Sequence, residues 1–117
     1  MTTETKPGCL FCKIVRKEIP AEIVFEDDDI LAFPDIAPKA PTHVLVIPKR
    51  HVDRLSDTTR ADEPLLGRLL GGLAEVARTL GLDDYRVVVN NGAGAGQVVF
   101  HVHVHLMAGR QFKWPAG

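Results

Sequence analysis

The feature that most constrains this chain is the alternating segment His101-Val102-His103-Val104-His105. On an extended strand, successive side chains point to opposite faces, so the three imidazoles would share one face. Neighbouring imidazoles would then lie roughly 7 Å apart, which is the rise of two strand residues. Burying polar rings without partners costs free energy, and exposing them gains little packing. We therefore expect these histidines to bind a ligand.

A glycine-spaced loop, NNGAGAGQ over residues 90–97, precedes the histidines. Such a loop lets backbone N–H groups approach an anion closely. A dinucleotide-binding motif would need a helix after the glycines, but residues 98–100 continue as strand. Two histidines on a strand can also present a divalent metal site, although the adjoining loop weighs against a catalytic metal here. A phosphate beside the histidines is the simplest joint interpretation.

Length, composition and charge exclude several classes of protein. The 117 residues are 45% hydrophobic and 25% charged, as in ordinary soluble single-domain proteins. A net charge of −1 gives no electrostatic footprint for nucleic acid or an anionic membrane. Because the first seven residues are polar and no apolar run could cross a bilayer, we expect a cytoplasmic protein. Residues 1–8 are predicted to be a flexible tail and residues 9–117 a single domain.

Apolar periodicity and turn signals predict two helices and five strands. The short helix spans 9–17 and ends before Pro20, and the long one spans 62–80 and ends at Gly81. The strands are expected over residues 22–26, 30–33, 43–47, 85–90 and 99–106.

This order of elements indicates an α+β fold, a mainly antiparallel five-stranded sheet with the long helix on one face. The histidine side of the last strand should then be open to solvent or a ligand. Gly67, Gly71 and Gly72 inside the long helix each cost up to about 1 kcal/mol relative to alanine, which predicts close packing there.

Cys9 and Cys12 are the two cysteines of the chain, spaced as Cys-x-x-Cys. In a cytosolic protein this spacing suggests metal or redox chemistry before a structural disulfide. A thioredoxin-like motif would need a preceding strand, whereas a polar tail precedes Cys9. Metal binding is therefore preferred, and the alternative is two reduced cysteines that act as small hydrophobes.

Several further segments complete a pattern that covers nearly the whole chain. They are FxKI (11–14), RKEIP (16–20), LAF (31–33), DI (35–36), APTH (40–43), VIPK (46–49), GRQ (109–111) and Trp114-Pro115. Together with the three histidines, this pattern resembles the histidine triad (HIT) family, in its Hint branch of purine nucleoside phosphoramidases. The resemblance implies a HIT-like fold and a homodimer whose two sheets join into one continuous sheet. The C-terminal tail of each subunit would reach toward the partner's site.

The resemblance also implies hydrolysis of purine nucleoside 5′-phosphoramidates in two steps. His103 would attack the α-phosphorus, expel the amine and form a nucleotidyl-histidine that water hydrolyses to the nucleoside monophosphate. An imidazole with a pKa near 6.5 is neutral enough at pH 7 to serve as this nucleophile. His101 would orient His103, His105 would contact the phosphate, and His43 completes the catalytic histidines.

By the same resemblance, Asp35 would accept hydrogen bonds from the ribose hydroxyls, and four apolar residues would enclose the purine: Phe11, Ile19, Phe33 and Ile36. From the residues alone, these four would be ordinary core. The remaining nucleotide contacts are expected at Asn90, Gly96, Gln97, Val99, His105 and Trp114. For Asn90, a turn-forming role is an alternative of similar weight. One departure is Val98, where many Hint relatives carry a serine that reaches the phosphate or leaving group, and a milder one is Phe100 in place of tyrosine.

Cys9, Cys12, His51 and His101 form a complete tetrahedral zinc set. Some bacterial histidine triad proteins hold a structural zinc at equivalent positions, while the branch with this C-terminal tail usually lacks zinc. We expect no cofactor to be required for the chemistry, and structural zinc stays open.

Three other functions remain as alternatives. The first is a dinucleoside polyphosphate hydrolase of the same family, against which the Trp114-Pro115 tail favours the phosphoramidase branch. The second is a nucleotide-binding regulatory or scaffold protein with slow turnover, which the Val98 departure keeps open. The third is a zinc protein whose histidines are all ligands, for which a chelator would abolish function.

Overall fold

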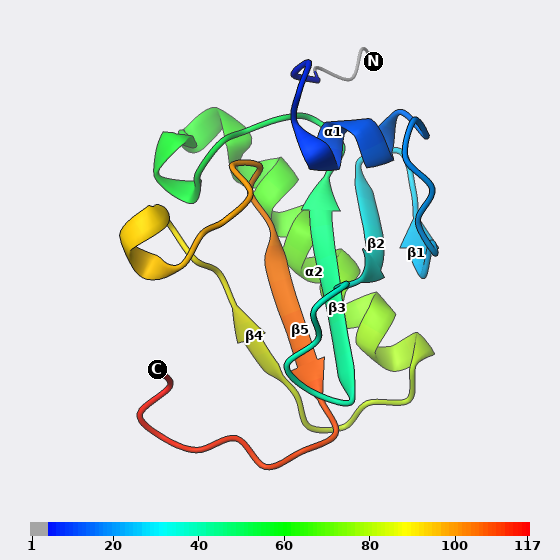
Figure 1. Cartoon of the computed structure of the whole chain (residues 1–117), viewed down its shortest axis with the longest axis vertical. Helices are drawn as coiled ribbons and strands as arrows, with labels where there is room; N and C mark the ends of the chain where they lie inside the picture. Colours follow the sequence, from blue (N-terminus) through cyan, green and yellow to red (C-terminus); the bar gives the residue numbers. More distant parts are fainter. Residues whose placement is uncertain (1–4) are drawn as a thin grey trace.

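The computed structural model describes residues 5–117, and their five strands form one antiparallel sheet (Figure 1). The strands are β1 (Phe25–Glu26), β2 (Ile30–Pro34), β3 (Thr42–Pro48), β4 (Arg86–Val88) and β5 (Val104–Ala108). Their order in the sheet is β1-β2-β3-β5-β4, so β5 lies between β3 and β4. The helices are α1 (Leu10–Val15) and α2 (Glu63–Thr79), with 3₁₀ turns η1 (Leu55–Asp57), η2 (Arg60–Asp62) and η3 (Ala93–Ala95).

The predicted α+β class, the five strands and both helices are confirmed, and the ends of three strands are corrected. The expected strand over 22–26 is paired only at Phe25–Glu26, and that over 85–90 only at Arg86–Val88. The expected last strand over 99–106 instead spans Val104–Ala108. His101 and His103 therefore lie before β5, outside the regular ladder.

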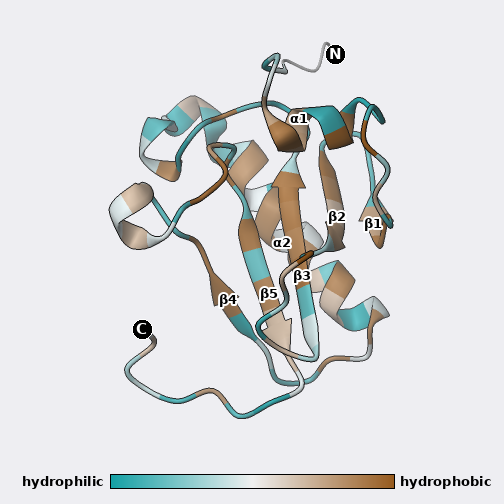
Figure 2. Cartoon of the chain, viewed as in Figure 1, coloured by the Kyte–Doolittle hydropathy of each residue, from teal (hydrophilic) through white to brown (hydrophobic). Residues whose placement is uncertain are grey.

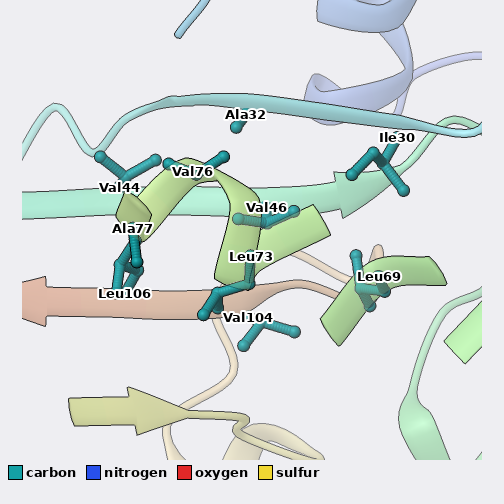
Figure 3. Packing of buried hydrophobic residues seen from close by; sticks show 10 residues of the cluster. All are labelled: Ile30, Ala32, Val44, Val46, Leu69, Leu73, Val76, Ala77, Val104 and Leu106. Carbon is teal, nitrogen blue, oxygen red and sulfur yellow. The ribbon is translucent and has the colours of Figure 1, made fainter. Parts of the chain in front are cut away.

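Helix α2 covers one face of the sheet and buries the main hydrophobic core. Its residues Leu69, Leu73, Val76 and Ala77 follow the helical spacing and are all buried. Figure 3 shows them packed on alternate residues of the three central strands: Ile30, Ala32, Val44, Val46, Val104 and Leu106. Each large side chain buried in this way contributes roughly 1.5–3 kcal/mol. β3, the strand at the centre of this contact, is hydrophobic over most of its length (Figure 2).

Of the three glycines that we expected to mark close packing in α2, only Gly72 does so. A Cβ at Gly72 would lie 1.9 Å from Ile30 Cδ1, so α2 packs closely on the Ile30 side chain, which would have to move to admit a larger residue. For Gly67 and Gly71 the prediction is wrong. A Cβ would meet no atom within 4 Å at Gly67 and only an Arg68 nitrogen, at 3.8 Å, at Gly71.

A second hydrophobic cluster lies on the other face of the sheet. It joins the remaining residues of β2 and β3 to helix α1, and its buried members are Phe11, Ile14, Leu31, Phe33, Leu45 and Ile47. Strand alternation explains the division, because even-numbered residues of these strands face α2 and odd-numbered ones face α1. Helix α1 is thereby fixed on the face where strand alternation also places His43 and His105.

No helix of residues 5–117 has the length and hydrophobicity that crossing a membrane requires.

Of the predicted N-terminal tail, residues 1–4 lie outside the described part of the chain. Lys6 follows them, and its backbone N–H donates to Cys12 Sγ at 3.2 Å.

Candidate functional site

The register between β3 and β5 places His43 and His105 side by side. Leu45 lies opposite His105, and His43 lies opposite Met107. Residues opposite each other in an antiparallel pair share a face, and diagonal neighbours two residues away are within reach of long side chains. All four side chains therefore point away from α2, and His43 meets His105 across the strands.

A cavity of about 1030 Å³ opens on this face of the sheet. Predicted site residues that line it are Phe11, Ile19, Phe33, Asp35, Ile36, His43, Asn90, Gly96, Val99, His103 and His105. Val98 also lines it and is 88% exposed. Of the predicted catalytic and nucleotide-binding residues, three do not line this cavity: Gln97, His101 and Trp114. The histidine side is thus open at His103 and His105 and closed at His101, which is fully buried.

One ring nitrogen of His103 is hydrogen-bonded to the main chain, and the other has no hydrogen bond within the described residues. His103 Nδ1 lies 2.7 Å from the carbonyl oxygen of His101, so Nδ1 carries the proton and donates it to that oxygen. In the neutral ring the lone pair is then on Nε2. Phe11 packs edge-to-face against the same ring, with the centroids 5.2 Å apart. A fixed tautomer with a free Nε2 lone pair is suited to nucleophilic attack.

The tautomers of His43 and His105 follow from a chain of hydrogen bonds. The backbone N–H of Lys39 donates to His43 Nδ1 at 2.9 Å, so the proton of His43 is on Nε2. His43 Nε2 lies 2.9 Å from His105 Nδ1 and donates to it. The proton of His105 is therefore on Nε2. Within residues 5–117 this N–H is buried and has no hydrogen-bond partner.

Both histidines of this pair are neutral at pH 7. Burial lowers the pKa of His105 to about 4, with further lowering from charge on His103 and His43. Burial also lowers the pKa of His43, against the opposing effect of Asp35, whose carboxylate lies 3.5 Å from His43 Nε2. We call His43, His103 and His105 the histidine row. Its unpaired buried N–H group costs free energy unless a ligand oxygen accepts from it.

Asp35 and the aromatic residues have structural contacts as well as places in the cavity wall. Asp35 accepts a hydrogen bond from the backbone N–H of Ala37 at 2.8 Å, which forms a tight turn at the end of β2. Phe11 and Phe33 are buried and pack edge-to-face with centroids 5.4 Å apart. For these two residues, core packing and a place in the wall are compatible. Ile36, in contrast, is 98% exposed.

Gln97 is buried, and both N–H groups of its amide and its oxygen bond to the main chain. Its oxygen accepts from the backbone N–H of Gly92 at 2.8 Å. Its nitrogen donates to the carbonyl oxygens of Asp53 at 2.7 Å and Val99 at 3.0 Å. These bonds hold the glycine loop in shape and fix it to the segment that follows β3. A direct phosphate contact of Gln97 stays a prediction, as does that of Trp114, which is 84% exposed and lies outside this cavity.

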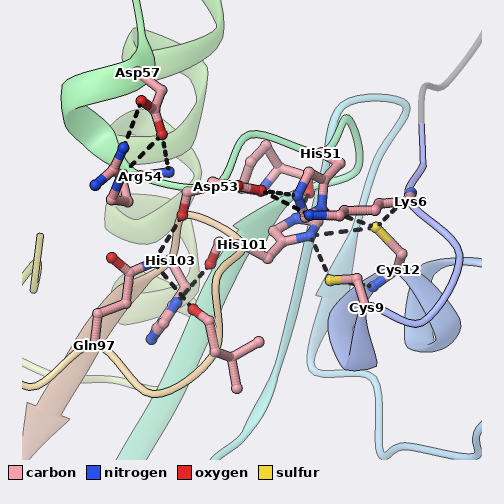
Figure 4. A network of polar contacts seen from close by, with 12 residues as sticks. Lys6, Cys9, Cys12, His51, Asp53, Arg54, Asp57, Gln97, His101 and His103 are labelled. Atoms are coloured by element: carbon pink, nitrogen blue, oxygen red, sulfur yellow. Dashed lines mark hydrogen bonds and ion pairs between the residues drawn. The ribbon is translucent and has the colours of Figure 1, made fainter. Parts of the chain in front are cut away.

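Cys9, Cys12, His51 and His101 come together at the other end of the histidine segment, and we call them the Cys/His cluster (Figure 4). Their four candidate ligand atoms lie within 4.8 Å of one another. Cys12 Sγ lies 3.2 Å from His51 Nδ1 and 3.5 Å from His101 Nδ1, which is also 3.5 Å from Cys9 Sγ. In the metal-free protein, burial raises the pKa of the Cys12 thiol.

The outer nitrogens of both imidazoles in the cluster are fixed by acceptors. His101 Nε2 donates to the carbonyl oxygen of Pro48 at 2.7 Å, and His51 Nε2 donates to the Asp53 carboxylate. Both Nδ1 lone pairs therefore face the sulfurs. Metal-binding histidines typically donate their second N–H to a carboxylate or a carbonyl in this way. Two thiolates and two imidazoles are a tetrahedral zinc set, so the residues fit this metal.

Several groups that shape the site were not predicted from the sequence. Pro48 and Asp53 orient the imidazoles of the Cys/His cluster, and Lys39 orients His43. Two of these three act through a main-chain group, for which residue type carries no signal. The Asp53 side chain follows His51 by two residues, and that spacing was the only available hint.

Comparison with known proteins identifies the fold family. The model of the HIT domain matches residues 16–112. An uncharacterized HIT-like protein of Synechocystis sp. is 55% identical over 109 residues, covering 92% of this chain and 96% of that protein. A 14 kDa zinc-binding protein of Zea mays is 50% identical over 112 residues, covering 92% of this chain and 87% of its own.

A crystal structure of a HIT family hydrolase from Legionella pneumophila superposes with a TM-score of 0.91 at 50% sequence identity. The match covers 94% of this chain and all of the other. A HIT family hydrolase from Clostridium thermocellum superposes with a TM-score of 0.90 at 39% identity, covering 93% and 96%. The histidine row and the cavity therefore sit on the fold of the HIT family hydrolases, and the chain belongs to the HIT domain family.

Proposed function

We propose that this protein hydrolyses purine nucleoside 5′-phosphoramidates through a nucleotidyl-histidine intermediate on His103. The single observation that carries the proposal is the pairing of two groups at the cavity. His103 Nδ1 donates to a carbonyl, which leaves the Nε2 lone pair for attack, and His105 offers a buried N–H without an acceptor. A phosphoryl group between them would meet a nucleophile and a hydrogen-bond donor at once.

In the first step, the lone pair of His103 Nε2 forms a bond to the α-phosphorus. The P–N bond breaks, and the amine leaves with a proton taken from water at the open mouth of the cavity. His105 Nε2–H donates to a phosphoryl oxygen and stabilises the charge that develops there. In the second step, water attacks phosphorus, the N–P bond returns its electron pair to His103, and a proton passes to solvent.

The walls of the cavity suit a purine nucleoside on one side of the phosphate. Phe11, Ile19 and Phe33 offer an apolar slot, and Asp35 has lone pairs left for the ribose hydroxyls after its bond to Ala37. Ile36 is exposed in the free protein and would close over the base. Asn90, Gly96 and Val99 also line the cavity and would contact the phosphate.

We further propose a homodimer joined through β4. Within residues 5–117, β4 pairs with β5 on one edge and offers its other edge for pairing. Val87 in β4 and Tyr85 and Val89 beside it are 37–41% exposed. An unpaired apolar edge strand of this kind favours association with another chain. Pairing of two such edges would make one continuous sheet. Trp114, which lies outside its own cavity, would then be free to reach the partner's.

For the Cys/His cluster we propose a structural zinc. The support is the converging pair of Nδ1 lone pairs and two sulfurs, and the similarity to a plant protein named for zinc binding. When bound, zinc would supply a rigid link between α1, the segment after β3 and the histidine segment. The histidine row performs the chemistry without zinc.

We expect a cytoplasmic location.

One observation favours a second function, a nucleotide-binding regulatory protein with slow turnover. Val98 is 88% exposed on the cavity wall and brings no hydroxyl to the leaving group. A dinucleoside polyphosphate hydrolase of the same family would use the same nucleophile on a different bond.

The test is steady-state hydrolysis of a fluorogenic adenosine 5′-phosphoramidate by wild type, His103→Ala and His103→Asn, each with and without a chelator. We expect both variants to lose at least about 10³-fold in rate and to bind AMP as wild type does. Wild-type hydrolysis should survive chelation. If wild type binds AMP but hydrolyses nothing, the phosphoramidase proposal fails and the regulatory function takes its place. Loss of wild-type hydrolysis with chelator alone would instead favour a metal-dependent reaction.

A further inference from the structure

We propose that Arg110 is a positioning residue for the histidine row, acting on His43 and His105 through the main chain of Lys39. This inference rests on the proposed function, because it assigns a role in the same reaction. It concerns a guanidinium on the C-terminal segment that touches none of the three histidines. Its effect would pass through three consecutive hydrogen bonds.

The first of these bonds fixes the loop before β3 to the segment after β5. Arg110 Nε donates to the carbonyl oxygen of Lys39 at 2.9 Å. A second, independent contact lies beside it, because Gly109 adopts a φ of +97° and packs directly on Pro41. A Cβ at Gly109 would lie 2.9 Å from Pro41 Cβ, so a side chain has no room there. Pairing of Thr42 with Ala108 brings the two segments together at this point.

The second bond links the loop to the first histidine. The backbone N–H of Lys39 donates to His43 Nδ1 at 2.9 Å. Lys39 is therefore held at both main-chain groups, with its oxygen on Arg110 and its N–H on His43. The bond to the guanidinium is charge-assisted and exposed, and the bond to His43 is part-buried. We expect loss of the guanidinium to free the Lys39 main chain and weaken its bond to His43.

The third bond carries the effect to the phosphate side of the cavity. With Nδ1 of His43 accepting from Lys39, His43 Nε2 must donate to His105 Nδ1, and the proton of His105 is on Nε2. If the Lys39 N–H moves away, His43 can take the opposite tautomer, in which its Nε2 accepts a hydrogen bond from the Nδ1–H of His105. His105 would then present a lone pair in place of its N–H group. A lone pair repels a phosphoryl oxygen, whereas the N–H stabilises it.

Neighbouring groups hold the guanidinium in place and supply a control. Arg110 Cζ lies 4.2 Å from the centroid of the Phe112 ring, and Arg86 Cζ lies 5.2 Å from the same centroid. Arg86 also donates to the carbonyl oxygen of Lys113 at 3.0 Å. Both arginines contact Phe112, but only Arg110 reaches Lys39. An Arg86 variant therefore disturbs the C-terminal segment without removing the bond to the loop.

The experiment compares Arg110→Ala, Arg110→Lys and Arg86→Ala with wild type in two measurements. Imidazole ¹⁵N chemical shifts of the ligand-free proteins report the tautomers of His43 and His105. Steady-state hydrolysis of an adenosine 5′-phosphoramidate separates kcat from KM. For Arg110→Ala we expect mixed tautomers at both histidines and a kcat about 10-fold lower, with KM changed less than about twofold.

We expect Arg110→Lys to recover most of the loss, because an ammonium can still donate to the Lys39 oxygen. Arg86→Ala should keep the wild-type tautomers and a kcat within about twofold of wild type. Unchanged tautomers in Arg110→Ala, or an equal loss of kcat in Arg86→Ala, would overturn the assignment. If wild type hydrolyses no phosphoramidate, the proposed function fails, and the ¹⁵N measurement still decides whether Arg110 sets the tautomers.

Discussion

The protein uses its five histidines in two adjoining regions that differ in how their nitrogens are satisfied. In the Cys/His cluster, both outer N–H groups have acceptors, and the remaining lone pairs converge on two sulfurs. In the histidine row, Lys39 and His101 fix the tautomers, and a lone pair and an N–H group are left for the cavity. The Cys/His cluster has its outer N–H groups paired and suits a stabilising metal. The histidine row has a lone pair and an N–H group without protein partners, and these groups can act on a bound ligand.

His101 connects the two regions. Its side chain belongs to the Cys/His cluster, while its carbonyl oxygen accepts a hydrogen bond from His103 Nδ1–H. Phe11 packs edge-to-face on both rings, with centroid distances of 5.9 Å and 5.2 Å. We therefore expect variants of the Cys/His cluster to lower Tm more than kcat, and variants of the histidine row to lower kcat more than Tm.

The largest expected effect on stability is the loss of the two thiols. Cys9→Ser with Cys12→Ser should remove one bound zinc per chain and lower Tm by more than about 10 °C, because metal-binding free energy adds to folding free energy. Hydrolysis at low temperature should stay within about threefold of wild type. Elemental analysis and calorimetry measure the two quantities. Zinc retained by the double variant would show that the cluster is not the metal site, whereas equal Tm values would show that the metal does not stabilise the fold.

His105→Ala should produce the opposite pattern. It removes the N–H that we place on the phosphoryl oxygen, so kcat should fall about 10²-fold. Tm should change by only a few degrees and the zinc content not at all, since His105 lies outside the cluster. Kinetics and calorimetry on the same preparation give both values. A Tm loss as large as that of the cysteine variant would break the division between the two regions.

The buried row predicts how stability depends on pH. The pKa of His105 is lowered to about 4 in the folded protein, and that of His43 is also lowered, while both are near 6.5 in the unfolded chain. Between pH 6.5 and 4 the unfolded chain binds protons that the folded one does not. The free energy of unfolding therefore rises with pH in this window and falls as the solution is acidified.

Urea denaturation at several pH values measures this slope. His105→Ala should make the dependence shallower between pH 6.5 and 4, because one histidine with a lowered pKa is gone. Above pH 7 the difference between the two proteins should be constant. A variant with the wild-type slope would mean that His105 titrates normally in the folded state.

Sequence patterns predicted the elements that depend on side-chain periodicity. The spacing of Leu69, Leu73 and Val76 located α2, and short apolar runs bounded by turn residues located β2 and β3. The start of the last strand was missed because of main-chain bonds. The carbonyl of His101 is taken by His103 Nδ1, and the N–H of Val102 donates to Val52 at 2.7 Å, so this stretch is not available to the ladder.

For the site, sequence motifs predicted which residues gather at the cavity better than they predicted the hydrogen bonds that those residues make. His43, His103 and Asp35 come together around one cavity as the motif implies. Gln97 was expected at the phosphate, and that contact stays a prediction. Its amide also bonds three main-chain groups, which nothing in the local sequence marks. Residues that act through a peptide group, such as Lys39, cannot be found from side-chain chemistry.

The smallest expected effect concerns the wall of the open region, where Val98 is exposed. Val98→Ser should leave Tm within about 2 °C, since surface changes alter stability by less than about 0.5 kcal/mol. It should raise kcat roughly two- to fivefold, because a hydroxyl there can form one net hydrogen bond to the leaving group or phosphate. Val98→Ala is the matched control, as it removes the same methyl groups without adding a hydroxyl. Equally raised kcat values in the two variants would mean that the loss of side-chain volume causes the effect. An unchanged kcat in both variants would place the leaving group elsewhere on the open side of the histidine row.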